Sequence, residues 1–389
     1  MKSETPLAAR AAVRALAASR IREIYNLGVG MPGLLAFWAG EGDEPTPEFI
    51  RRAGQASIEA GEVFYSQNLG IPELRETLAG YTSALHRKSF SPECIAVTSS
   101  GVSALMLASQ LLLDPGDRAV EVVPLWPNLQ EIPRILGAQT VTVPLRFGEE
   151  WTLDLGELLD ALTPRTRAVY INSPNNPTGW TITREAQKAI LAHCRRHGIW
   201  IVCDDAYERM YYGEGGVAPS FLDIAEPEDR VIGANTFSKS WLMTGWRLGW
   251  LVVPSALAPD LAKLIEYNTS CAPVFVQRAG VAAARDGEPV VAHSRERFRK
   301  ARDFLVGELR QIDGLHVSSP SGAMYLFFGI DGMTDSLEFC KRLLRETAVG
   351  LAPGSAFGPE GEGHVRWCFA SSEARLAEAV ARLRRMLAR

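Results

Sequence analysis

Short apolar runs rich in β-branched residues alternate with longer stretches of helical periodicity between about residues 95 and 255. The runs are IAVT, AVEVV, TVTVP, AVYIN, IWIVC, RVIGA and LGWLVV. Apolar strands separated by helices are typical of a largely parallel sheet that is buried on both faces. The pattern therefore predicts an α/β fold with a mostly parallel seven-stranded sheet sandwiched by helices. Ligands in such folds bind beyond the carboxyl ends of the strands.

The pattern changes in the last quarter of the chain. A long helical pattern covers residues 289–312, and the apolar runs AMYLFF and HVRWCF follow it, with helical patterns at 336–347 and 373–388. This order predicts a second, smaller α+β domain that a helix joins to the first. Near the start, arginines spaced among alanines favour a helical arm over a targeting peptide, because Glu23 interrupts the basic stretch.

Composition limits the classes of partner. The chain has 389 residues, of which 47% are apolar and 22% are charged, and its formal net charge is −4. That length suits two domains with a substantial core, and the charge provides no basic field for nucleic acid or an anionic membrane. No apolar stretch approaches the roughly 20 residues of a membrane span. The six cysteines lack CxxC spacing, which indicates neither a disulfide framework nor a zinc site and fits a reducing cytoplasm.

Three polar motifs each follow one of the predicted strands. SPNNPTG at 173–179 follows AVYIN, DDAYERMYY at 204–212 follows IWIVC, and TFSKSWLMTGWR at 236–247 follows RVIGA. Because the carboxyl ends of parallel strands meet at one edge of a sheet, the three motifs are expected to converge on one site.

Lys239 lies in the third motif, after hydroxyl side chains and eight residues before Arg247. A free lysine titrates at about 10.4 and is a poor nucleophile in water, so a reactive lysine needs a pocket that lowers its pKa. The flanking Trp241, Leu242, Met243 and Trp246 offer such a pocket. Taken alone, Lys239 would suit a surface position before a helix.

Together these motifs resemble the pyridoxal-phosphate enzymes of the aspartate aminotransferase superfamily, the class I/II aminotransferases of fold type I. The resemblance extends to GEGD at 40–43, YSQNLGIPELR at 65–75 and HVRWCFA at 364–370, and so covers nearly the whole chain. It implies a large cofactor-binding domain at 41–290 and a small domain formed by 1–40, with the N-terminal arm, and 291–389. It also implies pyridoxal 5'-phosphate as cofactor and a homodimer.

The resemblance assigns a cofactor contact to residues in every motif. Lys239 would hold the cofactor covalently and move the proton. Asp204 would pair with the ring nitrogen, with Tyr207 and Asn176 beside the ring oxygen. Trp126 would stack on the cofactor ring. The phosphate site would lie at the start of an apolar helix, and its contacts would be Ser100, Gly101, Val102, Thr236, Ser238 and Arg247. Tyr65 of the neighbouring subunit would complete the phosphate site.

Several of these residues also have a plainer interpretation. Ser100 would suit an ordinary helix cap, Trp126 a core position and Tyr65 a loop aromatic that packs on its own domain. Asp204 rather than Asp205 is preferred because of its spacing to Tyr207 and because successive strand residues point in opposite directions.

Substrate contacts are implied at the other end of the site. Arg366 would hold the substrate α-carboxylate as a bidentate pair, Gly40 would add a backbone contact, and Asn176 and Trp38 would complete the pocket. Gly42 stands where the family usually has proline, which leaves the conformation of that loop open.

The predicted function is amino transfer between an L-amino acid and a 2-oxo acid by a ping-pong mechanism. The same residues would also serve a C–S β-lyase or a related amino-acid lyase or synthase. A non-catalytic regulatory protein is a third reading, but the chain has neither a basic surface nor a preceding DNA-binding module. Neutral amino acids are favoured as donors because no cation occupies position 102 or the segment 266–271.

Two other site types are rejected. Gly28, Gly30 and Gly33 match the dinucleotide fingerprint, but Pro32 interrupts it and no strand-turn-helix unit surrounds it. The histidines fall in no catalytic or metal-binding pattern, so no metal is predicted.

Overall fold

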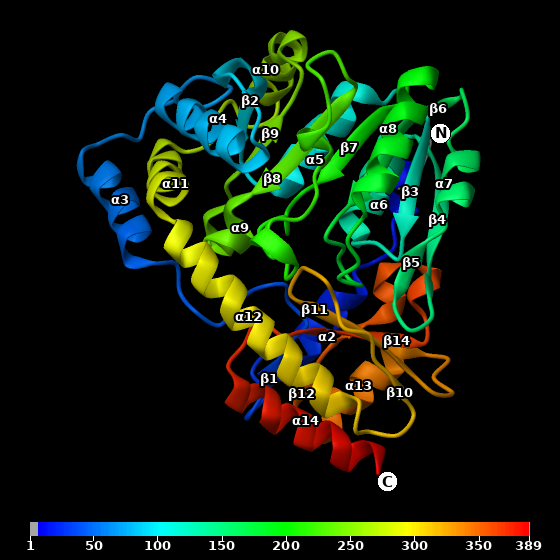
Figure 1. The fold of residues 1–389 in the computed structure, drawn as a ribbon. Coiled ribbons are helices and arrows are strands. Elements are labelled where there is room, and N and C mark those ends of the chain that lie inside the picture. Colours follow the sequence, from blue (N-terminus) through cyan, green and yellow to red (C-terminus); the bar gives the residue numbers. More distant parts are fainter. Residues whose placement is uncertain (1–6, 389) are drawn as a thin grey trace, which may run out of the picture.

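A computed structural model describes residues 7–388 as two lobes (Figure 1). Within these residues the largest sheet has eight strands in the order β2-β9-β8-β7-β6-β3-β4-β5. Neighbours from β8 to β4 pair in parallel, whereas β9 and β5 run antiparallel to their neighbours. The strands are β2 (Ile95–Thr98), β3 (Arg118–Val123), β4 (Gln139–Phe147), β5 (Trp151–Leu153), β6 (Thr166–Asn172), β7 (Trp200–Asp204), β8 (Val231–Thr236) and β9 (Gly249–Val252).

The predicted α/β fold is confirmed, and the sheet has one strand more than the seven predicted. The extra strand is β5, which turns back from β4 and pairs with it at the sheet edge. It has only three residues, WTL, and is too short to form an apolar run of its own. Its pairing depends on β4 rather than on its own sequence.

Helices cover both faces of this sheet, as the apolar strands require. Along β6, Val169 and Ile171 belong to one buried cluster, and Ala168 and Tyr170 belong to the other. Successive side chains of a strand point to opposite faces, so each face has its own core. The helices of this lobe are α3 (Glu48–Glu59), α4 (Pro72–His86), α5 (Gly101–Leu112), α6 (Pro127–Ile135), α7 (Leu155–Ala161), α8 (Arg184–His197), α9 (Phe237–Ser240), α10 (Ala258–Glu266) and α11 (Val274–Asp286).

The smaller lobe is built on an antiparallel sheet in the order β10-β11-β14-β13. Helix α12 (Glu288–Leu309) runs from the large lobe toward it, as the long helical pattern predicted (Figure 1). The other elements are α2 (Arg20–Gly28), β1 (Leu35–Ala36), β10 (Leu315–His316), β11 (Tyr325–Ile330), α13 (Ser336–Thr347), β12 (Val349–Gly350), β13 (Ala352–Pro353), β14 (His364–Cys368) and α14 (Glu373–Leu387). Short 3₁₀ turns occur at Pro92–Cys94, Glu214–Gly216, Phe221–Asp223, Thr244–Trp246, Ser255–Leu257, Gly354–Phe357 and Pro359–Gly361.

The N-terminal arm divides between the two lobes. Helix α1 (Ala11–Arg14) contacts α6 of the large lobe, where Arg10 Nη2 donates to the Ile135 carbonyl oxygen at 2.9 Å. Helix α2 packs on α13 and β13 of the small lobe. The arm therefore crosses from one lobe to the other, rather than lying wholly on the small one. Residues 1–6 of the arm lie outside the described residues.

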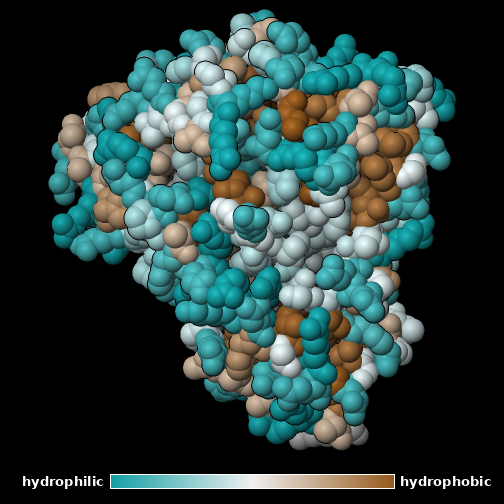
Figure 2. Space-filling model, in the orientation of Figure 1, coloured by the Kyte–Doolittle hydropathy of each residue, from teal (hydrophilic) through white to brown (hydrophobic). Residues whose placement is uncertain are grey.

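The surface of the face in Figure 2 is mostly hydrophilic, and its hydrophobic residues form separate patches. Between residues 7 and 388 no helix combines the length and apolar character that a membrane span requires.

Candidate active site

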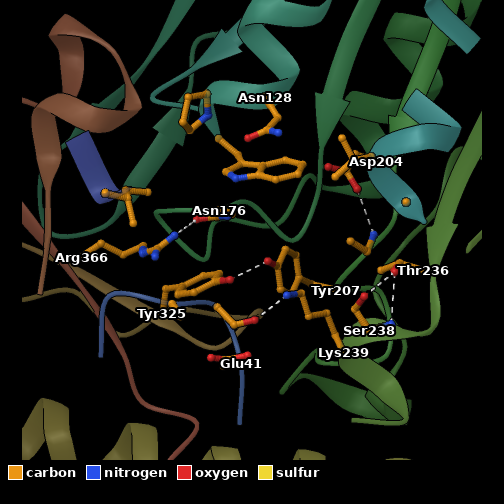
Figure 3. Close-up of a pocket in the computed structure, with 18 of the residues that line it drawn as sticks. Glu41, Asn128, Asn176, Asp204, Tyr207, Thr236, Ser238, Lys239, Tyr325 and Arg366 are labelled. Atoms are coloured by element: carbon orange, nitrogen blue, oxygen red, sulfur yellow. Dashed lines mark hydrogen bonds between the residues drawn. The ribbon is translucent and has the colours of Figure 1, made fainter. Parts of the chain in front are cut away.

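A cavity of about 590 Å³ opens between the two lobes, where β6, β7 and β8 end. It brings together most of the residues that the sequence motifs singled out. Its walls include Trp38, Gly40, Gly101, Val102, Trp126, Asn176, Asp204, Tyr207, Thr236, Ser238, Lys239, Arg247 and Arg366. Figure 3 shows many of these side chains around one space. Ser100 and Tyr65 do not line the cavity.

Lys239 lies in α9, a single turn that begins directly after β8. Thr236 caps this turn, because its hydroxyl oxygen accepts from the Ser238 backbone N–H at 3.2 Å. The Lys239 Nζ donates to the Gly40 carbonyl oxygen at 2.5 Å (Figure 3). Burial lowers the pKa of Lys239 from 10.5 to about 8, although the nearby Cys368 and Glu41 oppose this shift. A buried amine that loses its proton this readily can act as a nucleophile near neutral pH.

Asp204 is buried at the end of β7, and its Oδ1 accepts from the Ala206 backbone N–H at 3.2 Å. Burial raises its pKa to about 6, while the Ala206 N–H and the Lys239 charge act in the opposite direction. Asp205 does not line the cavity and instead accepts a hydrogen bond from the Ser220 hydroxyl at 3.2 Å. The two neighbouring carboxyl groups therefore have different surroundings, as the strand alternation predicted.

Asn172, which the sequence analysis did not single out, connects the motifs SPNNPTG and DDAYERMYY by hydrogen bonds. Asn172 is buried at the end of β6, opposite Asp204 in β7. Its amide nitrogen donates to the Asp204 carbonyl oxygen at 3.0 Å, and its side-chain oxygen accepts from the Asn176 backbone N–H at 2.7 Å. Its signal in the sequence is its position, since it is the last residue of the apolar run AVYIN.

Arg366 lies on β14 with 2% of its surface exposed, so it is no surface charge. Its Nη1 donates to Asn176 Oδ1 at 2.9 Å (Figure 3). Its Nη2 donates to the Trp38 carbonyl oxygen. Within residues 7–388 its Nε is buried and has no hydrogen-bond partner. A buried guanidinium with spare donors at a cavity wall suits a carboxylate ligand.

Tyr325 is a second residue that the motifs missed. Its hydroxyl lies 2.6 Å from that of Tyr207, and its ring lies 4.4 Å from the Arg366 guanidinium carbon. Phe327 pairs with Arg366 across β11 and β14, so alternation places Tyr325 on the same face. A Cβ atom at Gly40 would lie 2.0 Å from the Tyr325 hydroxyl, which explains why glycine occupies that position.

A candidate anion site lies on the side of the cavity away from Arg366, beside Thr236 and Ser238 (Figure 3). Gly101 and Val102 begin α5, so free backbone N–H groups face the cavity beside Thr236, Ser238 and Arg247. A Cβ atom at Gly101 would lie 3.0 Å from the Thr236 Cβ, so the glycine keeps this loop close to β8. These donors fit the phosphate group of the predicted cofactor.

Two residues that were predicted to contact the cofactor, Ser100 and Tyr65, do not line the cavity. The Ser100 hydroxyl oxygen accepts from the Ser103 backbone N–H at 3.0 Å, so its side chain caps α5. Ser100 is buried behind the cavity wall. Tyr65 is 88% exposed, so it does not pack on its own lobe.

The structure also shows where the glycines of the rejected dinucleotide fingerprint lie. Gly28 ends α2 and Gly30 and Gly33 lie in the turn before β1, so a helix precedes these glycines and a strand follows them. That order is the reverse of a dinucleotide-binding unit. The described part of the chain contains no group of three or more His, Cys, Asp or Glu residues that could hold a metal ion.

Comparison with known proteins gives consistent results. The sequence profile described as "Aminotransferase class I and II" matches residues 32–383. The aspartate aminotransferase of Pyrococcus horikoshii is 34% identical over 372 residues, which are 95% of this chain and 94% of that protein. A crystal structure of the Thermotoga maritima aspartate aminotransferase matches with a TM-score of 0.92 at 32% identity, covering 98% of this chain and all of that one. The alanine aminotransferase of Pyrococcus furiosus matches with a TM-score of 0.91 at 26% identity, over 98% and 100% of the two chains.

Proposed function

The chain belongs to the class I and II aminotransferases, and on that premise we propose how its residues move an amino group between an L-amino acid and a 2-oxo acid. The enzyme is dependent on pyridoxal phosphate and has fold type I. Its relatives are named aspartate aminotransferase and alanine aminotransferase, so membership of the family does not fix which amino acid is the donor.

The cofactor and Lys239 share the chemical steps in this proposal. When bound, pyridoxal phosphate supplies an aldehyde that links covalently to amines and a ring that accepts the electrons released at the substrate α-carbon. Lys239 would hold the aldehyde of the cofactor. Its amine, when free, would take the proton from the substrate α-carbon.

The remaining side chains hold the reacting groups in place. Asp204 would keep a proton on the ring nitrogen through the negative charge of its carboxylate, which lines the cavity at the end of β7. Tyr207 and Asn176 donate to the ring oxygen, and Trp126 covers the ring. Gly101, Val102, Thr236, Ser238 and Arg247 hold the phosphate, with Ser100 fixing the start of α5. Arg366 binds the substrate α-carboxylate next to Gly40 and Trp38.

One observation carries the proposal, namely that a half-buried lysine with a lowered pKa, a buried aspartate and a buried arginine share one cavity. The test is to add amino acids one at a time to the holoenzyme and to follow loss of the absorbance band of the lysine-linked cofactor. An active donor should convert the band and release one equivalent of 2-oxo acid. Ammonia or pyruvate formed continuously without a 2-oxo acid acceptor would instead identify a β-lyase.

The two domains have different roles in this proposal. We propose residues 41–290 as the cofactor-binding domain and residues 1–40 with 291–389 as the arm and small domain. Arg366 and Tyr325 come from the small lobe and Lys239 and Asp204 from the large one, so a movement between lobes would close the site on its substrate. We also place the enzyme in the cytoplasm, where the six cysteines, all free in residues 7–388, would stay reduced.

We propose a homodimer in which Tyr65 reaches the phosphate of the neighbouring subunit. Tyr65 and the apolar residues next to it, Val63 and Phe64, are exposed by 88%, 62% and 82%. Tyr267 is exposed by 90%. A neighbouring subunit that covers this segment would remove a large apolar area from water.

Substitution of Tyr65 by phenylalanine is expected to raise the Kd for pyridoxal phosphate about tenfold, because one hydrogen bond to a charged group is lost. Sedimentation should still show a dimer, since the ring remains. Tyr267→Phe is the matched control, because it removes a hydroxyl from another exposed tyrosine that does not line the cavity. A monomer in sedimentation, or a Kd that does not change in Tyr65→Phe, would contradict the proposed role.

A further inference from the structure

Tyr325 lines the cavity from the small lobe, and the proposed mechanism gives it no task. It begins β11, and only 1% of its surface is exposed. It pairs directly with Cys368 of β14, so its side chain lies on the same face of the small sheet as that of Arg366. The Arg366 guanidinium carbon lies 4.4 Å from the centroid of the Tyr325 ring, a distance typical of a cation–π contact. The ring of Tyr325 therefore supports the arginine that is proposed to bind the α-carboxylate.

The hydroxyl group of Tyr325 contacts the other lobe. Its oxygen lies 2.6 Å from the hydroxyl oxygen of Tyr207, which follows β7 in the large lobe (Figure 3). The two rings meet edge to face, with 5.5 Å between their centroids. Within residues 7–388 neither hydroxyl group has a second hydrogen-bond partner. One hydrogen bond therefore connects the carboxylate end of the cavity with a side chain that is proposed to donate to the cofactor ring oxygen.

Gly40 leaves the space that this hydroxyl group occupies. A Cβ atom at position 40 would lie 2.0 Å from the Tyr325 hydroxyl oxygen and 3.1 Å from the ring carbon that carries it. The Gly40 carbonyl oxygen accepts from Lys239, which holds this loop against the cavity. Because a phenol oxygen lies on the axis of its ring, rotation of the ring cannot move it out of this position. The Tyr325 hydroxyl group is therefore held between Gly40 and Tyr207.

The direction of the hydrogen bond between the two phenols decides what Tyr207 can offer the cofactor. Each phenol has one proton to donate. Burial raises the pKa of both hydroxyl groups, so both keep that proton at neutral pH. If Tyr207 donated to Tyr325, it would have no proton left for the ring oxygen. If Tyr325 donates instead, Tyr207 can donate to the ring oxygen, and the hydrogen bond that it accepts strengthens the one that it donates.

We propose that Tyr325 is a positioning residue that donates to the Tyr207 hydroxyl oxygen and thereby directs the Tyr207 proton to the ring oxygen of the cofactor. Its aromatic ring supports Arg366 at the same time, so one side chain of the small lobe serves both the cofactor and the substrate carboxylate. This inference rests on the proposed function, since it concerns two binding contacts of that same site. The hydroxyl group and the ring of Tyr325 have separate roles, which different substitutions remove.

The first test follows the absorbance band of the lysine-linked cofactor in the holoenzyme during a pH titration. A donor to the ring oxygen stabilises the anionic form of that oxygen and so lowers the pKa of the lysine-linked cofactor. Tyr325→Phe keeps the ring and removes the hydroxyl group, and it should raise this pKa by about one unit, the effect of one lost hydrogen bond. Tyr170→Phe is the matched control, because it removes a buried hydroxyl group that lies 2.9 Å from that of Ser109 and does not line the cavity. This control should leave the pKa of the cofactor unchanged.

A double substitution separates the proposed role from a general structural effect. In Tyr207→Phe no hydroxyl group is present to accept from Tyr325, so the further change Tyr325→Phe should leave the pKa of the cofactor as it is in Tyr207→Phe. An additive shift in the double variant would overturn the role of the Tyr325 hydroxyl group. The same shift in Tyr170→Phe as in Tyr325→Phe, or no shift in Tyr325→Phe, would also overturn it.

Calorimetry with butyrate, an inert monocarboxylate, tests the role of the ring in the holoenzyme. Tyr325→Phe should keep the butyrate affinity, whereas Tyr325→Leu should weaken it about fivefold, because the cation–π contact with Arg366 is lost. Equal affinities in the two variants would overturn the role of the ring. Neither measurement requires turnover. A pKa shift in Tyr325→Phe without amino transfer to any 2-oxo acid would therefore keep the role of Tyr325 and reject the proposed reaction, whereas amino transfer without that shift would do the reverse.

Discussion

Replacement of Lys239 by alanine is expected to abolish the covalent link to pyridoxal phosphate and to lower the rate of amino transfer by at least about a thousandfold. The loss is large because one amine has two tasks in the proposed mechanism, attachment and proton transfer. The structure gives neither task an obvious substitute, since Lys239 is the only lysine among the residues that line the cavity in the described chain. The absorbance band of the lysine-linked cofactor and the steady-state rate are the two measurements.

The control for this substitution is Lys188→Ala, which removes an exposed lysine from α8. This variant should keep both the band and the rate. The Lys239→Ala protein should still bind the cofactor without a covalent bond, because the phosphate site and Asp204 are unchanged. A band that survives in Lys239→Ala would show that another amine holds the cofactor.

The lowered pKa of Lys239 adds a pH dependence to the same prediction. Only the neutral amine attacks an aldehyde, and a shift in pKa from 10.5 to about 8 raises its fraction at neutral pH by about two orders of magnitude. The rate constant for addition of the cofactor to the apoprotein should therefore rise as the pH approaches about 8 and level off above it. A rate that continues to rise toward about pH 10 would show an ordinary lysine.

The fold was predictable from the sequence because the strands are buried on both faces. Their apolar runs stand out against the helical periodicity, and each is followed by a polar motif at its carboxyl end. Elements that depend on a partner were not predictable. The three-residue β5 exists by pairing with β4, and the contact of α1 with α6 joins segments that are far apart in the sequence.

A residue of the candidate site was predictable where its motif directly follows a strand, because the strand fixes the position of the side chain. Lys239 follows a strand directly, and the alternation within DDAY distinguishes Asp204 from Asp205. Tyr325 could not be found in this way, because it does not belong to a strand-end motif of the large sheet. Its position results from the packing of the small lobe against the edge of that sheet, which no local pattern records.

Substitution of Asp204 by asparagine is expected to lower kcat by about a thousandfold, while the covalent link through Lys239 remains. An amide has the shape of the carboxylate but no negative charge, so it cannot hold a proton on the ring nitrogen. Burial raises the pKa of Asp204 to about 6, which still leaves the group mostly ionised at neutral pH. Single-turnover rates of α-proton removal, together with the absorbance band, separate the loss of chemistry from a loss of cofactor.

Asp205→Asn provides the matched control, because the two carboxyl groups are adjacent and equally buried but have different surroundings. Burial, together with the neighbouring Asp204, raises the pKa of Asp205 and so favours its protonated form. An amide in its place therefore changes little charge, and the hydrogen bond with the Ser220 hydroxyl can persist. The Asp205→Asn enzyme should keep its kcat within about tenfold of the unaltered enzyme. The opposite result, with activity lost in Asp205→Asn and kept in Asp204→Asn, would reverse the assignment of the carboxylate that faces the cofactor.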